Sequence, residues 1–254
     1  MHKQYGFGLI WIIVLVTVLS AVGFAGYLVT RKDNGSDKTQ NIAEQSTTQD
    51  QEKDIELQNL GLTGFDQLDY TKYATSEYES KGLKGFYVFG DKLEGNRLNP
   101  NFEFSSVKKD APIIAAIDGI IGFIKEQPDT KDFEVFLQPK ENSMWTVGYD
   151  HLINLQVQKG QTIKAGDIIG YAAPQNNGLA RFEIQINKDS NGTTTHLCPS
   201  TLLMPAIKDR VLTELDAMQN QWEELSGFNL YDTSNQDPIG CIFTTLSPAQ
   251  AEGR

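Results

Sequence analysis

Histidine and cysteine, the side chains most used for metal binding and nucleophilic chemistry, are scarce in this chain. It has three histidines, His2, His151 and His196, and two cysteines among 254 residues. No two histidines have the His-x-His or His-Glu-x-x-His spacing that places two metal ligands side by side. A Gly-rich phosphate loop, a Gly-x-Ser-x-Gly turn and a Cys-x-x-Cys pair are also absent. These absences argue against the usual zinc peptidases, nucleotide-dependent enzymes, serine hydrolases and dithiol redox proteins.

Positive charge is also in short supply. The chain has 22 Lys and Arg against 33 Asp and Glu, a formal net charge of −11. Nucleic acids and anionic membrane surfaces attract basic patches. The balance therefore excludes nucleic acid as an expected partner and mainly favours solubility.

One long apolar run is present near the N-terminus. Residues 6–30 contain no charged side chain over 25 positions, more than the roughly 20 apolar residues that cross a bilayer. The apolar core of a cleaved signal peptide is shorter, about 7–15 residues. We therefore predict a membrane anchor over residues 1–32, with a signal peptide cleaved near residues 23–25 as the alternative. The flanking Lys and Arg residues do not decide the orientation. An N-terminal anchor commonly places a long downstream domain outside, so we expect a single-pass protein with an extracytoplasmic C-terminal domain.

The two cysteines, Cys198 and Cys241, both follow the apolar run. An even number of cysteines in an exported domain suggests a disulfide. Their spacing alone allows two buried thiols equally well, so both readings stay open. No cysteine ends the apolar run, which argues against a lipoprotein anchor.

The rest of the chain divides by composition into a stalk, a β domain and a C-terminal region. Residues 33–64 are predicted to be a flexible acidic and polar stalk, and residues 65–203 a β domain. Short β-type runs separated by Gly, Pro, Asp or Asn cover residues 86–89, 113–117, 120–124, 133–137, 145–149, 168–172 and 181–186. This pattern predicts a mainly β fold, a small antiparallel β-barrel or sandwich.

Residues 204–254 form the C-terminal region. Apolar residues at steps of three or four run from Ile207 to Leu225, Pro205 opens the segment and Gly227 follows it. We predict an amphipathic helix over residues 205–225 whose apolar stripe faces the core, followed by a turn-rich tail.

Two segments carry a resemblance to a known family. Residues 110–115 and 118–121 are similar to the Gly-Thr-Pro-Val-x-Ala…Asp-Gly-x-Val segment of the lysostaphin/LytM-type zinc endopeptidases, which cut peptidoglycan cross-bridges. Residues 149–152 and 157–170 resemble that family's Tyr-x-His-Leu segment and the Val-x-x-Gly repeat that follows it. Residues 179–184 align with its closing His-Leu-His-Phe-Glu-Val strand. The resemblance covers roughly residues 98–203 and implies the family's duplicated hybrid motif, with turns at Gly160 and Gly166.

The departures from the family concern its zinc ligands. In the family a His and an Asp of an early His-x-x-x-Asp segment and the second closing His hold the zinc. The early segment falls near residues 99–104, where no histidine occurs and Glu103 alone could stand for the Asp. The two closing histidines are Leu179 and Arg181. Arg carries a permanent charge and no acceptor, so it cannot ligate zinc. The resemblance therefore implies a degenerate member with no metal and no cofactor.

Several residues of this region are candidate site residues. In the family, the histidine equivalent to His151 assists the zinc-bound water, so His151 is a vestigial catalytic residue. Tyr149, Asp150, Arg181, Glu183 and Glu103 are predicted to line the former metal groove. Arg181 either binds a ligand carboxylate or pairs with Glu183, Glu103 or another acid of the sheet. His196 is expected on the surface or as a cap rather than as a metal ligand.

Three functions are considered for this sequence. The first is an inactive LytM-like domain that binds peptidoglycan or an envelope protein. The second is an active zinc metallopeptidase with rearranged ligands, using His151, Glu103 and Glu183. The third is a biotinyl- or lipoyl-type carrier, whose barrel shares the Val-x-x-Gly pattern; no Met-Lys-Met or Asp-Lys-Ala triplet is present to carry the cofactor. We favour the first.

Overall fold

A computed structural model describes residues 52–71 and 84–254. The predicted anchor, residues 6–30, and most of the predicted stalk lie outside the described residues. Within the described residues no helix is both long and apolar enough to cross a membrane. The described residues all belong to one compact unit.

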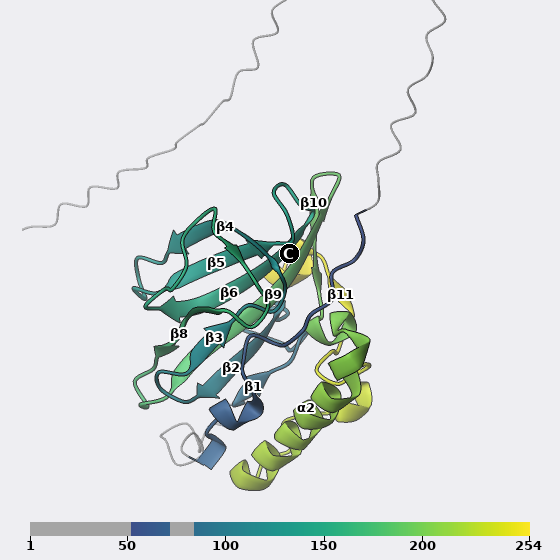
Figure 1. Cartoon of the computed structure of the whole chain (residues 1–254). Coiled ribbons are helices and arrows are strands. Elements are labelled where there is room, and N and C mark those ends of the chain that lie inside the picture. Colours follow the sequence, from purple (N-terminus) through teal and green to yellow (C-terminus); the bar gives the residue numbers. More distant parts are fainter. Residues whose placement is uncertain (1–51, 72–83) are drawn as a thin grey trace, which may run out of the picture. The chain divides into compact units, whose positions relative to one another are not determined.

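The described part is mainly antiparallel β-sheet with one main helix (Figure 1). The strands are β1 (Phe86–Tyr87), β2 (Asn101–Val107), β3 (Pro112–Ile114), β4 (Gly119–Glu126), β5 (Phe133–Gln138), β6 (Trp145–Ile153), β7 (Thr162–Ile163), β8 (Ile168–Pro174), β9 (Ala180–Ser190), β10 (Thr193–Leu197) and β11 (Thr245–Leu246). The helices are α2 (Pro205–Ser226) and α3 (Pro248–Glu252), with 3-10 turns η1 (Phe65–Gln67), η3 (Pro199–Leu202) and η4 (Thr233–Asn235).

The sheet is open rather than closed. Its strand order is β1-β2-β9-β8-β6-β5-β4-β7, with β9 also pairing β6. Among the described strands, β1 and β7 end the order and do not pair with each other. The mainly antiparallel β fold predicted from the sequence is confirmed, whereas the closed barrel is wrong. Closure needs the two edge strands to meet, and β1 and β7 are two residues long each.

Alternation along the strands separates two faces of the sheet. On β9, Phe182, Ile184 and Ile186 are buried in the core. On the neighbouring β6, Val147 and Tyr149 point to the same core. Successive side chains of a strand point to opposite faces, so Arg181, Glu183 and Asp150 lie on the other face, here called the outer face.

The core is closed by elements from both ends of the chain. Residues 55–62, which the sequence analysis assigned to the stalk, pack onto the domain, where Leu57 is fully buried. The Leu57 N–H donates to Leu202 O and the Gln58 N–H to Ala116 O, so this arm lies between β3 and the start of α2 (Figure 1). The folded domain therefore includes residues before residue 64.

Helix α2 confirms the predicted amphipathic segment. Pro205 occupies its first turn and Gly227 ends it in the left-handed conformation, with φ of 72°. Val211, Leu215, Met218 and Trp222 are buried, as the stripe predicted. Leu225 is 40% exposed, because it lies in the last turn, beyond the reach of the core.

The disulfide left open by the sequence is present: Cys198, after β10, is joined to Cys241. The C-terminal segment also pairs with the sheet, since β11 pairs β10 and Cys241 bridges Phe89. The turn-rich tail is therefore part of the domain.

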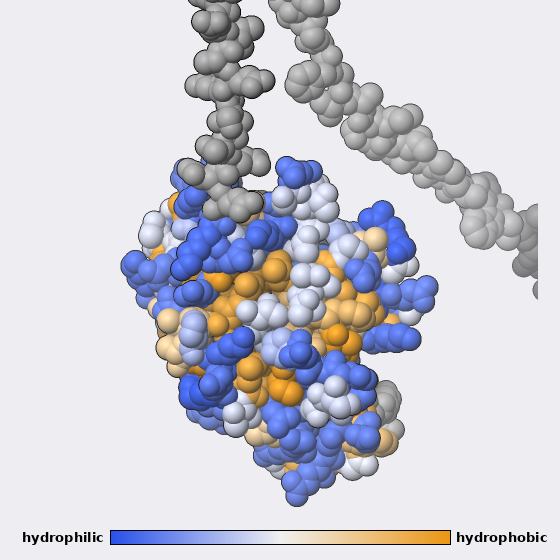
Figure 2. Space-filling view, turned by 90° about the vertical axis from the view of Figure 1, so that its right-hand side faces the viewer, coloured by the Kyte–Doolittle hydropathy of each residue, from blue (hydrophilic) through white to orange (hydrophobic). Residues whose placement is uncertain are grey.

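Exposed hydrophobic side chains occur on several elements of the domain. Figure 2 shows hydrophobic surface at the middle of the face on the α2 side of Figure 1, ringed by hydrophilic residues. The large exposed hydrophobic side chains of the described residues are Phe123, Ile168, Leu225, Phe228, Ile242 and Phe243. Single exposed apolar residues are ordinary on a protein surface, so they assign no partner by themselves.

Candidate functional site

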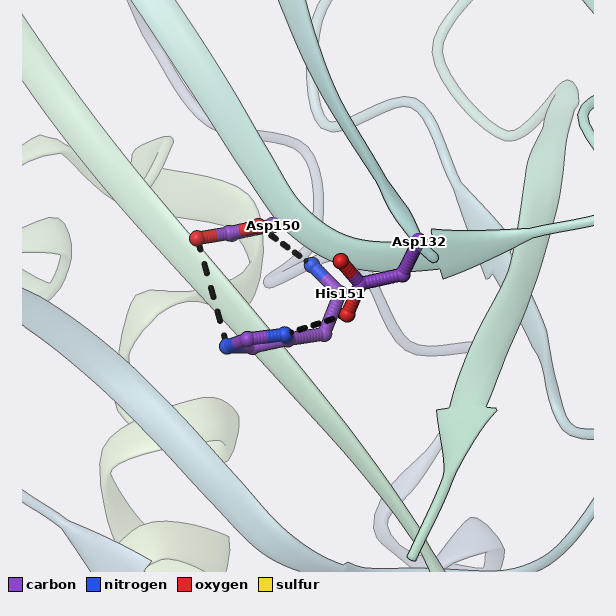
Figure 3. Close-up of side chains that lie close together, drawn as sticks. All are labelled: Asp132, Asp150 and His151. Carbon is purple, nitrogen blue, oxygen red and sulfur yellow. Dashed lines mark hydrogen bonds and ion pairs between the residues drawn. The ribbon is translucent and has the colours of Figure 1, made fainter. Parts of the chain in front are cut away.

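A β-bulge places His151 and Asp150 on the outer face together. Val135 pairs with Tyr149 and Phe133 with Leu152, so two residues of β6 oppose Glu134 of β5. His151 takes a left-handed backbone conformation, with φ of 59°, which is uncommon for a residue other than glycine. A bulge turns a side chain away from strict alternation. Consecutive residues therefore reach the same cluster (Figure 3).

Three carboxylates surround the His151 ring. Nδ1 lies 2.6 Å from Asp132 Oδ2. On the other side, Nε2 lies 3.3 Å from Glu183 Oε1 and 3.9 Å from Asp150 Oδ2. The His151 side chain is only 13% exposed, and its backbone N–H donates to Asp150. The ring is fixed in orientation from both edges.

This environment favours the charged imidazole. Burial of the ring disfavours the cation, and so does nearby Arg181. The hydrogen bond to Glu183 and the charges of Asp150 and Glu183 outweigh both and raise the pKa of His151 to about 9. His151 is therefore a cation at neutral pH and a poor general base there.

We expect His151 to titrate near pH 9 by NMR, with His196 titrating below the usual histidine range. Burial lowers the pKa of His196, so the second described histidine is an internal comparison. Because the folded pKa of His151 is above the unfolded value of about 6.5, its stabilising contribution is complete below that pH and is lost as pH rises through about 9. The free energy of unfolding should fall over this window by on the order of 3 kcal/mol. A His151 titration at or below pH 6.5 would contradict the geometry.

Arg181 bridges two glutamates that face each other across the sheet. Glu103 on β2 and Glu183 on β9 are direct cross-strand partners, an arrangement that destabilises a sheet when both are charged and unpaired. Arg181 donates to Glu183 through a terminal guanidinium nitrogen, and its Nε lies 3.1 Å from Glu103 Oε1. Two further donors hold the glutamates: Asn101 donates to Glu183 and Ser105 donates to Glu103 at 3.0 Å.

The two glutamates differ in proton affinity. Burial and the charge of Glu183 raise the pKa of Glu103. Burial would also raise the pKa of Glu183, but His151 and Arg181 lower it. Glu183 is therefore the permanent anion of the cluster, held between two cations.

A groove opens beside this cluster. It has a volume of about 630 Å³ and is lined by residues 129–132, His151, Ile153, residues 173–176 and Arg181. A second hollow of about 530 Å³ lies on the same outer face, lined by Phe123, Phe136, Thr146, Gln185 and neighbouring residues. The Phe123 and Phe136 ring centroids lie 5.9 Å apart. Together the hollows offer charged, amide and aromatic contacts along one sheet face.

The predicted groove residues are placed as follows. Glu103, Asp150, Arg181 and Glu183 meet around His151 on the outer face. Tyr149 was wrongly expected there: it is fully buried and its hydroxyl accepts the Ala116 N–H at 2.7 Å. The residue precedes the bulge, where alternation still holds and turns its side chain to the core.

His196 lies away from this cluster. It sits on β10, and its Nδ1 is 2.7 Å from Asn187 Oδ1. The half-buried ring is thus engaged with the neighbouring strand.

Sequence reasoning missed Asp132 and Asn101. Asp132 is 2% exposed and lies in the turn before β5. Asn101 opens β2, two residues before Glu103. Neither position carries a local sequence signal, because each acts through a strand neighbour distant in the chain.

The zinc implied by the family resemblance does not fit these residues. Asn99 is 2% exposed and its amide donates to backbone carbonyls. Leu179 is buried in the core, and Arg181 is a cation. Asp132, Asp150 and His151 are close enough to form a metal-type cluster, but Asp132 already occupies Nδ1. On the Nε2 side, the nearest carboxylate oxygen is bound by Arg181.

Comparison with known proteins agrees with the resemblance. The model of peptidase family M23 matches residues 103–194. Solved structures similar to the chain include the antimicrobial peptidase lysostaphin from Staphylococcus simulans, with 20% identity and a TM-score of 0.35 over 43% of this chain and 44% of that chain. The catalytic domain of the prophage-encoded M23 protein EnpA from Enterococcus faecalis has 18% identity and a TM-score of 0.36, covering 46% of this chain and 91% of that chain. The SpoIIQ–SpoIIIAH pore-forming complex has 14% identity and a TM-score of 0.40, covering 59% and 92%. No curated protein matches the chain significantly.

Proposed function

Because the chain carries a peptidase M23 (lysostaphin/LytM-type) domain over residues 103–194, we propose that it is a catalytically inactive domain of this type that binds peptidoglycan without cutting it. The family is related to cell-wall peptidases, so a cell-wall polymer is the natural ligand class to consider.

The proposal is carried by the chemistry of the former ligand positions. Asn99 binds backbone carbonyls, Leu179 is buried and Arg181 is an ion-pair cation. A catalytic zinc needs about three protein ligands and an open position for water. The described residues supply no such set around Arg181. His151, held as a cation, is also unsuited to take a proton from water near neutral pH.

The outer face supports a binding role. Its two hollows run along one sheet face and combine hydrogen-bonding side chains with the exposed ring of Phe123. Concave sites with a few placed polar groups among apolar contacts are typical of ligand binding. An extended polymer can contact both hollows, whereas a small ligand would use one.

The proposed location is extracytoplasmic. Residues 6–30 would anchor the chain as a single membrane span, and residues 31–51 would connect the anchor to the domain. The Cys198–Cys241 disulfide is in keeping with an oxidising compartment.

The test uses the full chain in detergent. We expect it to sediment with insoluble peptidoglycan, to contain less than one zinc per chain, and to release no new amino groups from peptidoglycan even when zinc is added. Equimolar zinc with cross-bridge cleavage would overturn inactivity. Failure to sediment would overturn peptidoglycan binding and favour an envelope protein as the partner.

Two exposed phenylalanines give a matched pair of variants. Phe123→Ala alters the outer face, and Phe243→Ala alters the C-terminal segment; the side chains are 49% and 43% exposed. We expect Phe123→Ala to weaken binding about fivefold or more, the loss typical of an interface aromatic, and Phe243→Ala to leave it unchanged. Equal effects of the two would place binding elsewhere.

A further inference from the structure

The hollow of about 530 Å³ beside Phe123 differs in chemistry from the charged groove around His151. We propose that this hollow is a sugar-binding site, which takes the uncharged pyranose rings of the glycan strand and not the charged peptides of peptidoglycan. This inference rests on the proposed peptidoglycan binding and adds which part of the polymer the hollow contacts.

A continuous row of side-chain positions crosses the outer face at this hollow. Phe123 of β4 pairs with Phe136 of β5, which in turn pairs with Gly148 of β6. Gly148 pairs with Gln185 of β9, and Gln185 pairs with Asn101 of β2. Residues directly opposite each other on neighbouring strands lie on the same face of a sheet. Neighbouring strands are about 4.8 Å apart, so the row extends over roughly 19 Å, enough for more than one sugar ring.

One end of this row is an exposed aromatic surface. Phe123 is 49% exposed, and its ring centroid lies 5.9 Å from that of Phe136, with 35° between the two ring planes. The face of an aromatic ring carries partial negative charge. The C–H bonds on one side of a pyranose ring carry partial positive charge, so a sugar ring can stack on the exposed phenylalanine while its hydroxyl groups point outward.

Uncharged hydrogen-bonding groups line the same hollow. They are the side chains of Gln138, Thr146 and Gln185. Within residues 52–71 and 84–254, the Gln138 amide and the Thr146 hydroxyl make no hydrogen bond to another protein group. Gln185 accepts from Asn187 at 3.2 Å through Oε1, which leaves its N–H donors for a ligand. Amides and hydroxyls both donate and accept, so they match the hydroxyl and acetamido groups of an amino sugar.

The hollow also carries almost no net charge. Lys125 and Glu134 are the charged members of its lining, and they are cross-strand partners with Nζ 3.3 Å from Oε2. Because these two charges offset each other, the hollow does not favour the carboxylates and amines of a peptide. The groove lined by Asp132, His151 and Arg181 is the charged part of the outer face.

The centre of the row is kept open by Gly148. A Cβ added there would meet Phe136 at 3.6 Å and Gln185 at 3.7 Å. These are ordinary van der Waals distances, and Gly148 is not one of the glycines with positive φ, so a side chain is tolerated by the fold. A larger side chain would stand between Phe136 and Gln185 and fill the space that a sugar ring needs.

The experiment titrates a β-linked N-acetylglucosamine tetramer, which has no charge, into the full chain and measures binding by calorimetry. The detergent must have no sugar head group, because such a head group would compete for the site. A peptidoglycan stem peptide without sugar is the comparison ligand. We expect the tetramer to bind the wild type.

Two substitutions of Phe123 separate ring stacking from plain apolar contact. Phe123→Trp keeps an aromatic face and should bind the tetramer at least as tightly as the wild type. Phe123→Leu keeps an apolar side chain without a ring and should weaken binding on the order of fivefold.

Gly148→Val tests the open centre of the row. Valine is favoured in strands, so this variant should fold like the wild type, as checked by thermal unfolding, and should weaken tetramer binding at least as much as Phe123→Leu. Phe243→Ala is the control, since Phe243 is 43% exposed and does not line this hollow; it should bind the tetramer like the wild type.

Three outcomes would overturn the inference. The first is that the wild type does not bind the tetramer. The second is that Phe123→Leu and Gly148→Val both bind it like the wild type, because the sugar would then contact another surface. The third is that the stem peptide binds and that these two variants lose it, because the hollow would then take peptide.

Sedimentation with whole peptidoglycan separates this inference from the proposed function. A protein that sediments but does not bind the tetramer keeps the proposed function and loses the sugar site. A protein that does not sediment loses the proposed function, whatever the tetramer does.

Discussion

Reduction of the Cys198–Cys241 disulfide is expected to lower the free energy of unfolding by about 4 kcal/mol, the chain-entropy estimate for a loop of this size. The bond joins residues 43 positions apart. It also fixes the C-terminal segment, whose contacts with the sheet are short: β11 is two residues long, and Cys241 makes a single bridge to Phe89. Backbone hydrogen bonds such as Phe89 N–H to Gly240 O and Cys198 N–H to Thr244 O also hold this segment, so the main expected effect of the bond is on the unfolded chain.

Urea unfolding of the full chain, with and without reductant, measures this effect. The reduced protein should also show a larger dependence on urea, since its unfolded state is less constrained. The double variant Cys198→Ala/Cys241→Ala should be less stable than the oxidised wild type and insensitive to reductant. A loss below about 1 kcal/mol on reduction, well under the usual range for a native disulfide, would show that the C-terminal segment is held mainly by packing.

Local periodicity predicted much of the fold. The runs at 120–124, 133–137 and 168–172 fall within β4, β5 and β8, and the stripe from Ile207 matches α2. These signals depend on neighbours two to four residues apart, which a sequence displays directly. Whether the sheet closes depends on contacts between edge strands that are distant in the sequence. Local periodicity therefore could not distinguish a closed barrel from an open sheet. Strand β2 was not delimited, since its Asn, Glu and Ser residues dilute the β-type pattern.

The residues of the candidate site also divide into those that the sequence could indicate and those that depend on distant contacts. Glu103, Asp150, Arg181 and Glu183 could be named because they align with a family pattern. The bulge at His151 could not, because it is defined only by the register between β5 and β6. Strict alternation would have placed Asp150 and His151 on opposite faces. The contacts of Asp132 and Asn101 also join residues that are distant in the sequence. Asp132 orients His151, and Asn101 orients Glu183.

The described structure makes Glu183 the residue on which the cluster depends. It contacts Arg181, His151 and Asn101 at once, and its side chain is 8% exposed. The two cations around it are themselves mostly buried, with side chains 37% and 13% exposed for Arg181 and His151. Removing this anion would take away the carboxylate that the two cations share, leaving Glu103 beside Arg181 and Asp132 and Asp150 beside His151.

Glu183→Ala is therefore expected to lower the free energy of unfolding by roughly 2–4 kcal/mol, somewhat less than a fully buried pair because Arg181 is partly solvated. His151 would lose the hydrogen bond that raises its pKa and should titrate well below pH 9, so part of the cost is relieved by loss of its proton. Urea unfolding and the NMR titration of His151 measure the two effects in the same variant.

Glu134→Ala is the matched control, since Glu134 lies on the same outer face and pairs with Lys125, whose side chain is 57% exposed. Its loss should cost less than about 1 kcal/mol, as for other exposed pairs, and leave His151 near its original pKa. If both variants lose the same stability, the loss of stability in Glu183→Ala would come from burial of the Glu183 carboxylate rather than from its two cation partners. If only Glu183→Ala is destabilised and the His151 pKa falls with it, the cluster is held by charge, with Glu183 as its anion and Arg181 and His151 as its cations.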